Sequence, residues 1–263
     1  MQLLLRYLAF WFRSGNAHAV HSPFVFDLYT RVIRPAARHP DFGKADFGKI
    51  ETLRAELLAD PREMDTVDLG AGSRVARSPR RRVKDIARYA QKDARTGQLL
   101  FRLVGHFAPR TLFDLGTSLG ITTAYLAAAN PQAAVYTFEG CPHTLGIAST
   151  NFARLGYRHI RPVYGNLDET LPATLREVVS LDFVFFDANH RREPTLRYFT
   201  TCLAKVHEDS VFVFDDIYWS AEMRTAWEEI KSHAAVTLTV DLFHVGLVFF
   251  RRKQPKQHFR LRM

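Results

Sequence analysis

The chain has 263 residues, of which 47% are hydrophobic, so it can bury a full core in one large domain, or in one domain with a small appendage. Two cysteines, Cys141 and Cys202, are too few for a disulfide framework, and their apolar contexts indicate reduced thiols in a cytoplasmic protein. The net charge of +9 gathers in two basic runs, at residues 74–84 and 251–262. Such runs are typical of solvated faces, with nucleic acid, an anionic substrate and acidic lipid as the alternative partners.

The N-terminal residues 1–12 are almost wholly apolar, but Arg6 interrupts them and Arg13 ends the run, short of the ~20 residues that span a bilayer. Neither a transmembrane helix nor a signal peptide is expected, because the basic n-region and the cleavage site of a signal peptide are missing. Apolar side chains surround nearly the whole of this short predicted helix. This pattern predicts burial against the domain or against a second subunit of a homodimer, and weak contact with a membrane surface is the alternative.

From residue 111 onward, short β-rich runs alternate with helical stretches, which is the pattern of a parallel sheet wrapped by helices. The expected strands cover residues 111–116, 134–140, 160–166, 181–188, 210–216, 236–242 and 246–252. Only three residues separate the last two strands, too few for a crossover helix, so these strands must pair antiparallel. The sequence therefore predicts an α/β fold with a doubly wound seven-stranded sheet, mostly parallel, that closes with an antiparallel C-terminal hairpin.

Upstream of this sheet, the sequence predicts helices, and the region over residues 83–107 is expected to be helical and to lead into the first strand. There are no internal repeats and no low-complexity linker, so a separate N-terminal domain is not expected. We expect residues 1–96 to form a helical cap on the substrate side of a Rossmann-like domain at residues 97–263.

Two segments look like a cofactor loop, one at residues 67–73 and one at residues 113–120. A cofactor cradle needs a strand before it, glycines where the backbone approaches the ligand, and a helix after it with free amides. Only the second segment has all three, and its Gly-x-x-x-Gly spacing departs from the Gly-x-Gly-x-x-Gly of dehydrogenases. The predicted cofactor contacts in this loop are Asp114, Gly116, Thr117, Ser118 and Gly120.

A second group of predicted cofactor contacts follows the next two strands. Glu139 ends one strand and is placed to accept hydrogen bonds from both hydroxyls of a ribose, with Gly140 directly after it. Gly165 and Asn166 end the following strand and would border the adenine. Ligands of open sheets bind beyond the carboxyl ends of the strands, so these residues are expected to converge on one crevice. The alternative for Glu139 is an ordinary surface carboxylate at a strand end.

Three acids follow the fourth and fifth strands, Asp187 after one and Asp215 and Asp216 after the other. Like charges so placed repel unless they are protonated, hydrogen-bonded or bridged, and a hard divalent ion with oxygen ligands would suit them. The alternative is that one acid caps a helix while another, Asp187, binds the cofactor. His190 stands three places after Asp187, and since a free imidazole titrates near pH ~6.5 it could take a proton from a hydroxyl. The alternatives for His190 are helix capping and cofactor contact.

Together these features resemble the catechol and caffeoyl-CoA O-methyltransferase family, whose members are class I methyltransferases that use S-adenosylmethionine. The resemblance rests on Gly97, Gln98, residues 114–120, Glu139, residues 187–190, Asp215 and Asp216. It covers residues 97–252 and implies S-adenosylmethionine as cofactor, with Mg²⁺ held by Asp187, Asp215 and Asp216. The family has Asn as the last metal ligand and Lys as general base, where this chain has Asp216 and His190.

The resemblance implies methyl transfer to a hydroxyl of a small-molecule acceptor, with assistance from a divalent metal. It leaves out the N-terminal cap, where this family chooses its acceptor. Two alternatives stay open. One is an RNA or protein methyltransferase that uses the basic runs, whose affinity for nucleic acid would fall steeply with salt. The other is a non-catalytic cofactor-binding protein, because a fold alone does not fix a function.

Overall fold

The structure is a computed structural model that describes residues 2–35, 47–67, 80–252 and 254–263. The chain divides into two compact units, which are described one at a time. Unit 1 comprises Met1–His39 and Leu175–Met263, and unit 2 comprises Pro40–Thr174. Most of the upstream segment that looks like a cofactor loop lies outside the described residues, as does the first part of the basic run that follows it.

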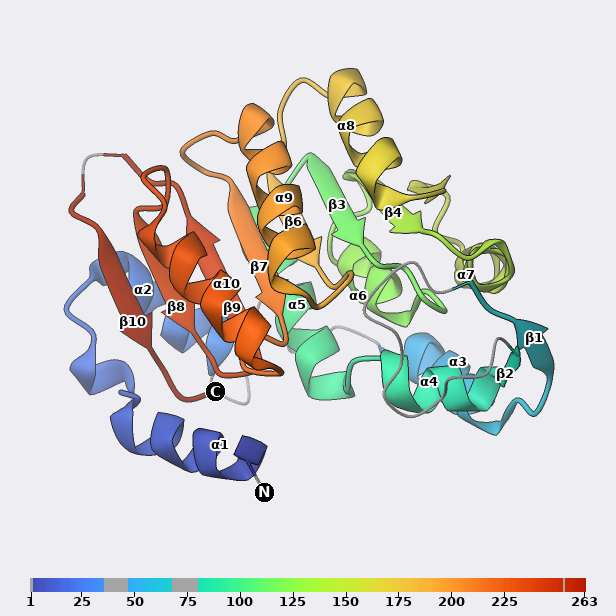
Figure 1. The fold of residues 1–263 in the computed structure, drawn as a ribbon, viewed down its shortest axis with the longest axis horizontal. Helices are drawn as coiled ribbons and strands as arrows, with labels where there is room; N and C mark the ends of the chain where they lie inside the picture. Colours follow the sequence, from blue (N-terminus) through green and yellow to red (C-terminus); the bar gives the residue numbers. More distant parts are fainter. Residues whose placement is uncertain (1, 36–46, 68–79, 253) are drawn as a thin grey trace. The chain divides into compact units, whose positions relative to one another are not determined.

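Unit 2 contains three parallel strands in the order β3-β4-β5 (Figure 1). They are β3 (Thr111–Leu115), β4 (Ala134–Glu139) and β5 (Ile160–Tyr164). Nearly every residue of β3 and β4 is buried, as expected for parallel strands whose two faces are both covered by helices. Helix α6 (Ile121–Ala129) connects β3 to β4, and α7 (Pro142–Leu155) connects β4 to β5. These two βα units carry the predicted cofactor loop and Glu139 at the carboxyl ends of their strands.

Further helices and a small hairpin complete unit 2. They are α3 (Gly48–Ala59), β1 (Glu63–Asp65), β2 (Arg80–Arg82), α4 (Val83–Ala90) and α5 (Ala94–Phe107). The region of residues 83–107, which was expected to be helical, is confirmed as such and consists of two helices, because the chain breaks after α4 and starts α5 anew. Asp93 caps the second helix, and its side chain accepts a hydrogen bond from the Thr96 amide at 2.8 Å.

The packing of α5 against α6 explains one residue of the family resemblance. A Cβ at Gly97 of α5 would lie 2.6 Å from the ring of Tyr125 in α6, so only glycine lets the two helices approach this closely. The Tyr125 hydroxyl in turn donates to the Glu51 carboxylate of α3. Burial and this carboxylate raise the pKa of Tyr125. Gly97 therefore serves helix packing.

Unit 1 contains five strands in the order β10-β8-β9-β7-β6. They are β6 (Phe183–Phe186), β7 (Val211–Asp215), β8 (Leu238–Asp241), β9 (Val245–Phe249) and β10 (Gln257–Arg260). Strands β6 and β7 are parallel, β9 is antiparallel to both β7 and β8, and β10 runs parallel to β8. The predicted fold, a mostly parallel sheet with an antiparallel C-terminal hairpin, is confirmed. The predicted count of seven strands is too low, because the polar β10 reads in the sequence as part of a basic tail.

The helices of unit 1 are α1 (Gln2–Arg13), α2 (Pro23–Leu28), α9 (Arg192–Cys202) and α10 (Ala221–Ser232), and α8 (Leu167–Glu177) crosses the boundary between the units along the chain. In Figure 1, α9 and α10 lie in front of the strands of unit 1 and α2 lies behind them. The Lys256 ammonium donates to the last carbonyls of α10, those of residues 231–233, and so caps this helix. Within the described parts of the chain, no helix has the length and apolarity to cross a membrane.

A buried polar group joins the hairpin of unit 1 to the turn after β7. The Tyr218 hydroxyl donates to Asp241 Oδ2 at 2.7 Å, and the Phe243 amide donates to Asp241 Oδ1 at 2.9 Å. Arg260 Nε of β10 lies 3.7 Å from the same Oδ2. Burial raises the pKa of Asp241 although all three partners act in the opposite direction.

Candidate cofactor and metal sites

In unit 2, the loop between β3 and α6 has a backbone that suits close approach of a ligand. Gly116, Ser118 and Gly120 all have positive φ angles, of 119°, 49° and 86°. A Cβ at Gly120 would also lie 2.6 Å from the ring of Phe152. Both the positive φ angle and this close contact therefore favour glycine at position 120. Helix α6 begins directly after Gly120, and the first amides of a helix have no partner within it. The loop is therefore a main-chain cradle of the kind that binds polar ligand groups.

Asp114 supports this loop from inside unit 2. Its side chain is fully buried, and Oδ2 accepts hydrogen bonds from the hydroxyls of Thr123 at 2.5 Å and Thr137 at 2.8 Å. The Thr137 hydroxyl also lies 2.6 Å from that of Thr117 in the loop. The two threonines outside the loop were missed in the sequence, although a buried carboxylate needs such donors in the strand and helix beside it. Asp114 thus ties the loop to β4 and α6.

Glu139 lies at the end of β4, and two backbone amides fix its position. Oε2 accepts from the amide of Ser118 in the glycine loop at 2.8 Å, and Oε1 accepts from the Cys141 amide at 2.9 Å. A carboxylate accepts about four hydrogen bonds, so these two amides orient Glu139 without exhausting its capacity for ligand hydroxyls. The structure therefore brings the predicted ribose acceptor and the glycine loop together.

The remaining predicted cofactor residues of unit 2 lie at the same strand ends. Gly165 has a φ of 133°, and its amide donates to the Glu139 carbonyl at 3.1 Å. Asn166 stands at the start of α8, where its side chain accepts from the Asp168 amide at 3.0 Å. Gly140 follows Glu139 directly and is partly exposed. Gly165 thus stands beside Glu139, whereas the Asn166 side chain already caps a helix.

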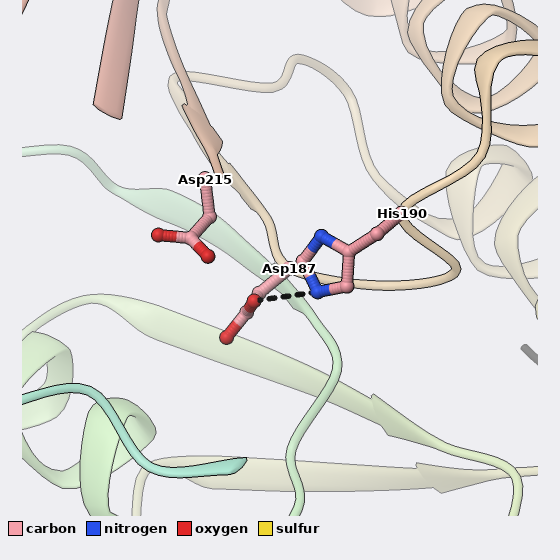
Figure 2. Close-up of side chains that lie close together, drawn as sticks. All are labelled: Asp187, His190 and Asp215. Atoms are coloured by element: carbon pink, nitrogen blue, oxygen red, sulfur yellow. Dashed lines mark ion pairs between the residues drawn. The ribbon is translucent and has the colours of Figure 1, made fainter. Parts of the chain in front are cut away.

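In unit 1, two of the predicted metal ligands and the predicted base form one cluster. Asp187 follows β6 and Asp215 ends β7, and these neighbouring parallel strands bring the two carboxylates together. Figure 2 shows the His190 ring directed at Asp187, with Nε2 lying 3.4 Å from Asp187 Oδ1. One ligand atom from each of these three residues lies within 4.8 Å of the others. Asp215 is buried and the Asp187 side chain is nearly so, whereas the His190 side chain is 27% exposed, so the two carboxylates are the more screened part of the cluster.

Two comparisons place this geometry among known proteins. Residues 113–217 match a protein family described as a methyltransferase domain. A catechol O-methyltransferase from Mycobacterium tuberculosis (strain ATCC 25618 / H37Rv) is 30% identical over 126 residues, which are 47% of this chain and 56% of that protein. The chain thus spans little more than half the length of this curated relative.

Solved structures show the same fold. The O-methyltransferase TomG from Streptomyces achromogenes, in complex with SAM, has a TM-score of 0.56 and 22% identity over 62% of this chain and 82% of its own. The O-methyltransferase from Bacillus cereus, in complex with SAH, has a TM-score of 0.54 and 21% identity over 61% and 83%. The match over residues 113–217 and these solved structures show that the chain has the fold of these O-methyltransferases.

The candidate metal cluster differs in one member from the sequence prediction. Asp216, predicted as the third ligand, is not in the group of three, and its carbonyl accepts from the Trp219 amide at 2.9 Å in the turn after β7. His190, predicted as a base, stands in the group instead.

The backbone next to the cluster is strained on both sides. Asn189 and Asp216 have φ angles of 58° and 53°, in the left-handed region that side chains other than glycine seldom adopt. Such strain costs of order 1–3 kcal/mol per residue and gathers at functional sites of proteins. Asn189 directly precedes His190 and Asp216 directly follows Asp215, so unit 1 holds these unusual backbone angles next to its acid cluster.

Proposed function

We propose that the chain is an S-adenosylmethionine-dependent methyltransferase that methylates a hydroxyl of a small molecule. The observation that carries the proposal is Glu139 held against the Ser118 amide of the glycine loop, since this pair suits a ligand with ribose hydroxyls. The family match over residues 113–217 supports methyl transfer. The names of the relatives, O-methyltransferases of which two contain SAM or SAH, support oxygen as the acceptor atom.

The residues of unit 2 would hold the cofactor chiefly through the main chain. When bound, S-adenosylmethionine supplies an activated methyl group, so the protein has only to align an acceptor oxygen and remove its proton. The amides at the start of α6 and the backbone of Gly116 would meet its polar groups, and Glu139 would accept from both ribose hydroxyls. Gly165 and Asn166 would border the adenine, and Asp114 keeps the loop in place.

The cluster of unit 1 would hold a divalent cation such as Mg²⁺. Two carboxylates whose oxygens lie within 4.8 Å repel each other, and a cation between Asp187 and Asp215 would offset that repulsion. A cation there would lower the pKa of an acceptor hydroxyl and fix its direction. Asp216 remains a proposed ligand from the family resemblance, and His190 lies beside the two carboxylates, where it can act as the base.

His190 would take the proton from the acceptor. Asp187 Oδ1 lies 3.4 Å from His190 Nε2 and favours the tautomer with the proton on that nitrogen. Nδ1 is then the atom that accepts the proton from the substrate. Asp187 would therefore serve both the cation and the orientation of the base.

Calorimetry with S-adenosylmethionine and its demethylated product tests the cofactor assignment. We expect both to bind the full chain, and failure of both to bind would contradict the proposed function. Methyl transfer to catechol, the acceptor that the name of the curated relative suggests, then tests the metal. Full activity in the presence of EDTA would remove the cation from the mechanism.

The role of His190 is tested by its pH profile. His190→Gln should lower kcat by about 100-fold or more, since loss of a positioned base costs that much. His190→Lys should keep part of the activity and move the rise in kcat to higher pH, because lysine loses its proton at higher pH. Equal loss in both variants, with an unchanged pH profile, would argue for a purely structural histidine.

Among the described residues, the C-terminal basic run does not favour an RNA or protein methyltransferase. Two of its cations are engaged within unit 1, where the Arg251 guanidinium lies 4.2 Å from the Phe24 ring and Lys256 caps α10. These two contacts serve the fold of unit 1.

A further inference from the structure

Helix α1 is anchored to the body of unit 1 along one face. Phe10 is buried against the rings of Phe243 and Tyr218, at centroid distances of 5.4 Å and 6.1 Å. Arg6 Nη1 donates to the Tyr218 carbonyl at 3.2 Å. The helix therefore has a fixed position in unit 1, and Figure 1 shows it beside the C-terminus.

The segment after α1 is joined to the end of the chain by main-chain hydrogen bonds. The Gly15 amide donates to the Arg260 carbonyl at 2.9 Å, and the Arg262 amide donates to the Gly15 carbonyl at 3.1 Å. The Arg262 guanidinium stacks over the Trp11 ring at 4.1 Å. Helix α1 and the C-terminal residues consequently form one surface, which we call the α1 surface.

The outer face of α1 is apolar and exposed. Its side chains Leu4, Leu5, Leu8, Trp11 and Phe12 are 62%, 59%, 44%, 42% and 75% exposed. Leu4, Leu8 and Phe12 follow one another at a spacing of four residues and so form a stripe along one side of the helix. Contiguous apolar patches of this kind mark a surface that meets another apolar phase or partner.

Only positive charges accompany this apolar stripe in the sequence. Residues 1–26 and 242–263 contain no Asp or Glu, whereas they contribute Arg13 at the end of α1 and Arg262 beside it. Arg13 is exposed, and the Arg262 guanidinium lies over the Trp11 ring of the helix. The α1 surface thus combines leucine, tryptophan and phenylalanine side chains with a cationic border.

We propose that the α1 surface binds an anionic membrane surface, with α1 lying in the plane of the lipid headgroups. An interfacial helix places its apolar side chains ~5–10 Å into the headgroup and acyl boundary, and arginines beside it attract anionic lipid. Trp11 between Arg13 and Arg262 suits this boundary, where amphipathic aromatic rings gather.

The charge distribution favours lipid over a second copy of the chain. A two-fold dimer brings the same patch of both subunits together, so the arginines of both copies would share one interface to which residues 1–26 and 242–263 contribute no acid. Like charges in an interface oppose association, whereas anionic headgroups neutralise them. Nucleic acid would leave the leucines and Phe12 in water.

Cosedimentation with large unilamellar vesicles tests this proposal. We expect the full chain to pellet with vesicles containing about one third phosphatidylserine in phosphatidylcholine, and about tenfold less with phosphatidylcholine alone. High salt should weaken the binding to the anionic vesicles, because screening shortens the reach of the arginines. Absence of binding to anionic vesicles at low salt would overturn the proposal.

Variants at exposed positions separate the apolar contribution from the charged one. Phe12→Glu should weaken vesicle binding by about tenfold or more, since it removes one inserted side chain and adds an anion. Arg13→Gln should weaken it by about fivefold. Val179→Glu is the matched control, because Val179 is 95% exposed in unit 1 but lies outside α1, and it should bind as the parent does.

Two results with these variants would contradict the proposal that the α1 surface binds an anionic membrane. One is equal loss of vesicle binding in Val179→Glu and Phe12→Glu, which would indicate nonspecific adsorption. The other is a dimer in sedimentation equilibrium that Phe12→Glu dissociates, in a chain that does not bind anionic vesicles. That outcome would assign the α1 surface to a second copy.

Discussion

The glycine loop of unit 2 and the acid cluster of unit 1 are built by different means. The loop is made of main chain, and Asp114, Thr123 and Thr137 hold it through buried hydrogen bonds that also stabilise the fold. The cluster is made of side chains, and Asp187 and Asp215 are held close together although their charges repel. Substitutions in the glycine loop should therefore lower the free energy of unfolding, whereas substitutions in the acid cluster should lower cation binding.

The largest expected effect is on the cation affinity of the cluster. Asp187→Asn should weaken Mg²⁺ binding by about 100-fold or more, because an anionic oxygen ligand is lost. The free energy of unfolding in EDTA should change by less than about 1 kcal/mol, since repulsion is relieved while contacts are lost. Calorimetric titration and urea unfolding measure the two quantities, with exposed Asp209→Asn as the control. A large loss of stability with unchanged Mg²⁺ affinity would contradict the view that Asp187 contributes to cation binding and not to the stability of the fold.

The glycine loop should respond in stability. Gly120→Ala places a Cβ 2.6 Å from the Phe152 ring at a φ of 86°, and should lower the free energy of unfolding by about 2 kcal/mol. Gly146→Ala in α7 is the matched control, because no heavy atom lies within 4 Å of its added Cβ. It should gain about 0.5–1 kcal/mol from helix propensity. Equal stability of the two variants in urea would show that the loop is not under this constraint.

Glu139→Gln changes a side chain that both binds backbone amides of the fold and is proposed to bind the ribose hydroxyls of the cofactor. Its amide group would face one of the two backbone N–H donors, those of Ser118 and Cys141, and its lost charge would weaken the ribose contacts. We expect the affinity for S-adenosylhomocysteine to fall about tenfold by calorimetry. Glu169→Gln, at an exposed position of α8, should leave the affinity unchanged. Unchanged affinity in Glu139→Gln would argue for an ordinary strand-end carboxylate.

The smallest expected effect concerns the buried Asp241, which belongs to neither the glycine loop nor the acid cluster. Burial raises its pKa, so the folded chain holds this proton more tightly than the unfolded chain does. The free energy of unfolding should therefore fall as pH rises from the ordinary Asp value, near ~3.9, through the raised value. Asp241→Asn should lack this fall, so the wild type should lose stability relative to the variant as pH rises from about 4 through the raised pKa of Asp241. Parallel pH curves in urea unfolding would contradict the assignment.

The buried strands were predictable because their apolar runs are long and lie between clear helices. Strand β10 was not, since Gln257–Arg260 pairs only through its main chain with β8 and its side chains stay partly exposed. A polar strand of this kind gives no period in hydrophobicity. The break before α5 was missed for a related reason, because the Asp93 cap interrupts an otherwise continuous helical pattern.

The candidate sites were predictable as residue types at strand ends, but their partners were not. Glu139 and the glycine loop were expected to meet, and the bond between Glu139 and Ser118 joins them. The grouping of His190 with the acids depends on the left-handed turn at Asn189, which no local residue pattern demands. Side-chain direction after a strand is set by such turns, and sequence spacing alone does not encode it.

The main-chain bonds of Gly15 with Arg260 and Arg262 also have a kinetic consequence. These bonds join segments at opposite ends of the sequence. The chain must therefore lose the conformational entropy of a long loop before the bonds can form and offset that loss. This contact should form late in folding and open early in the native state. In hydrogen exchange, the amides of Gly15 and Arg262 should exchange well before those of β7, in an opening that releases α1 while the core stays closed.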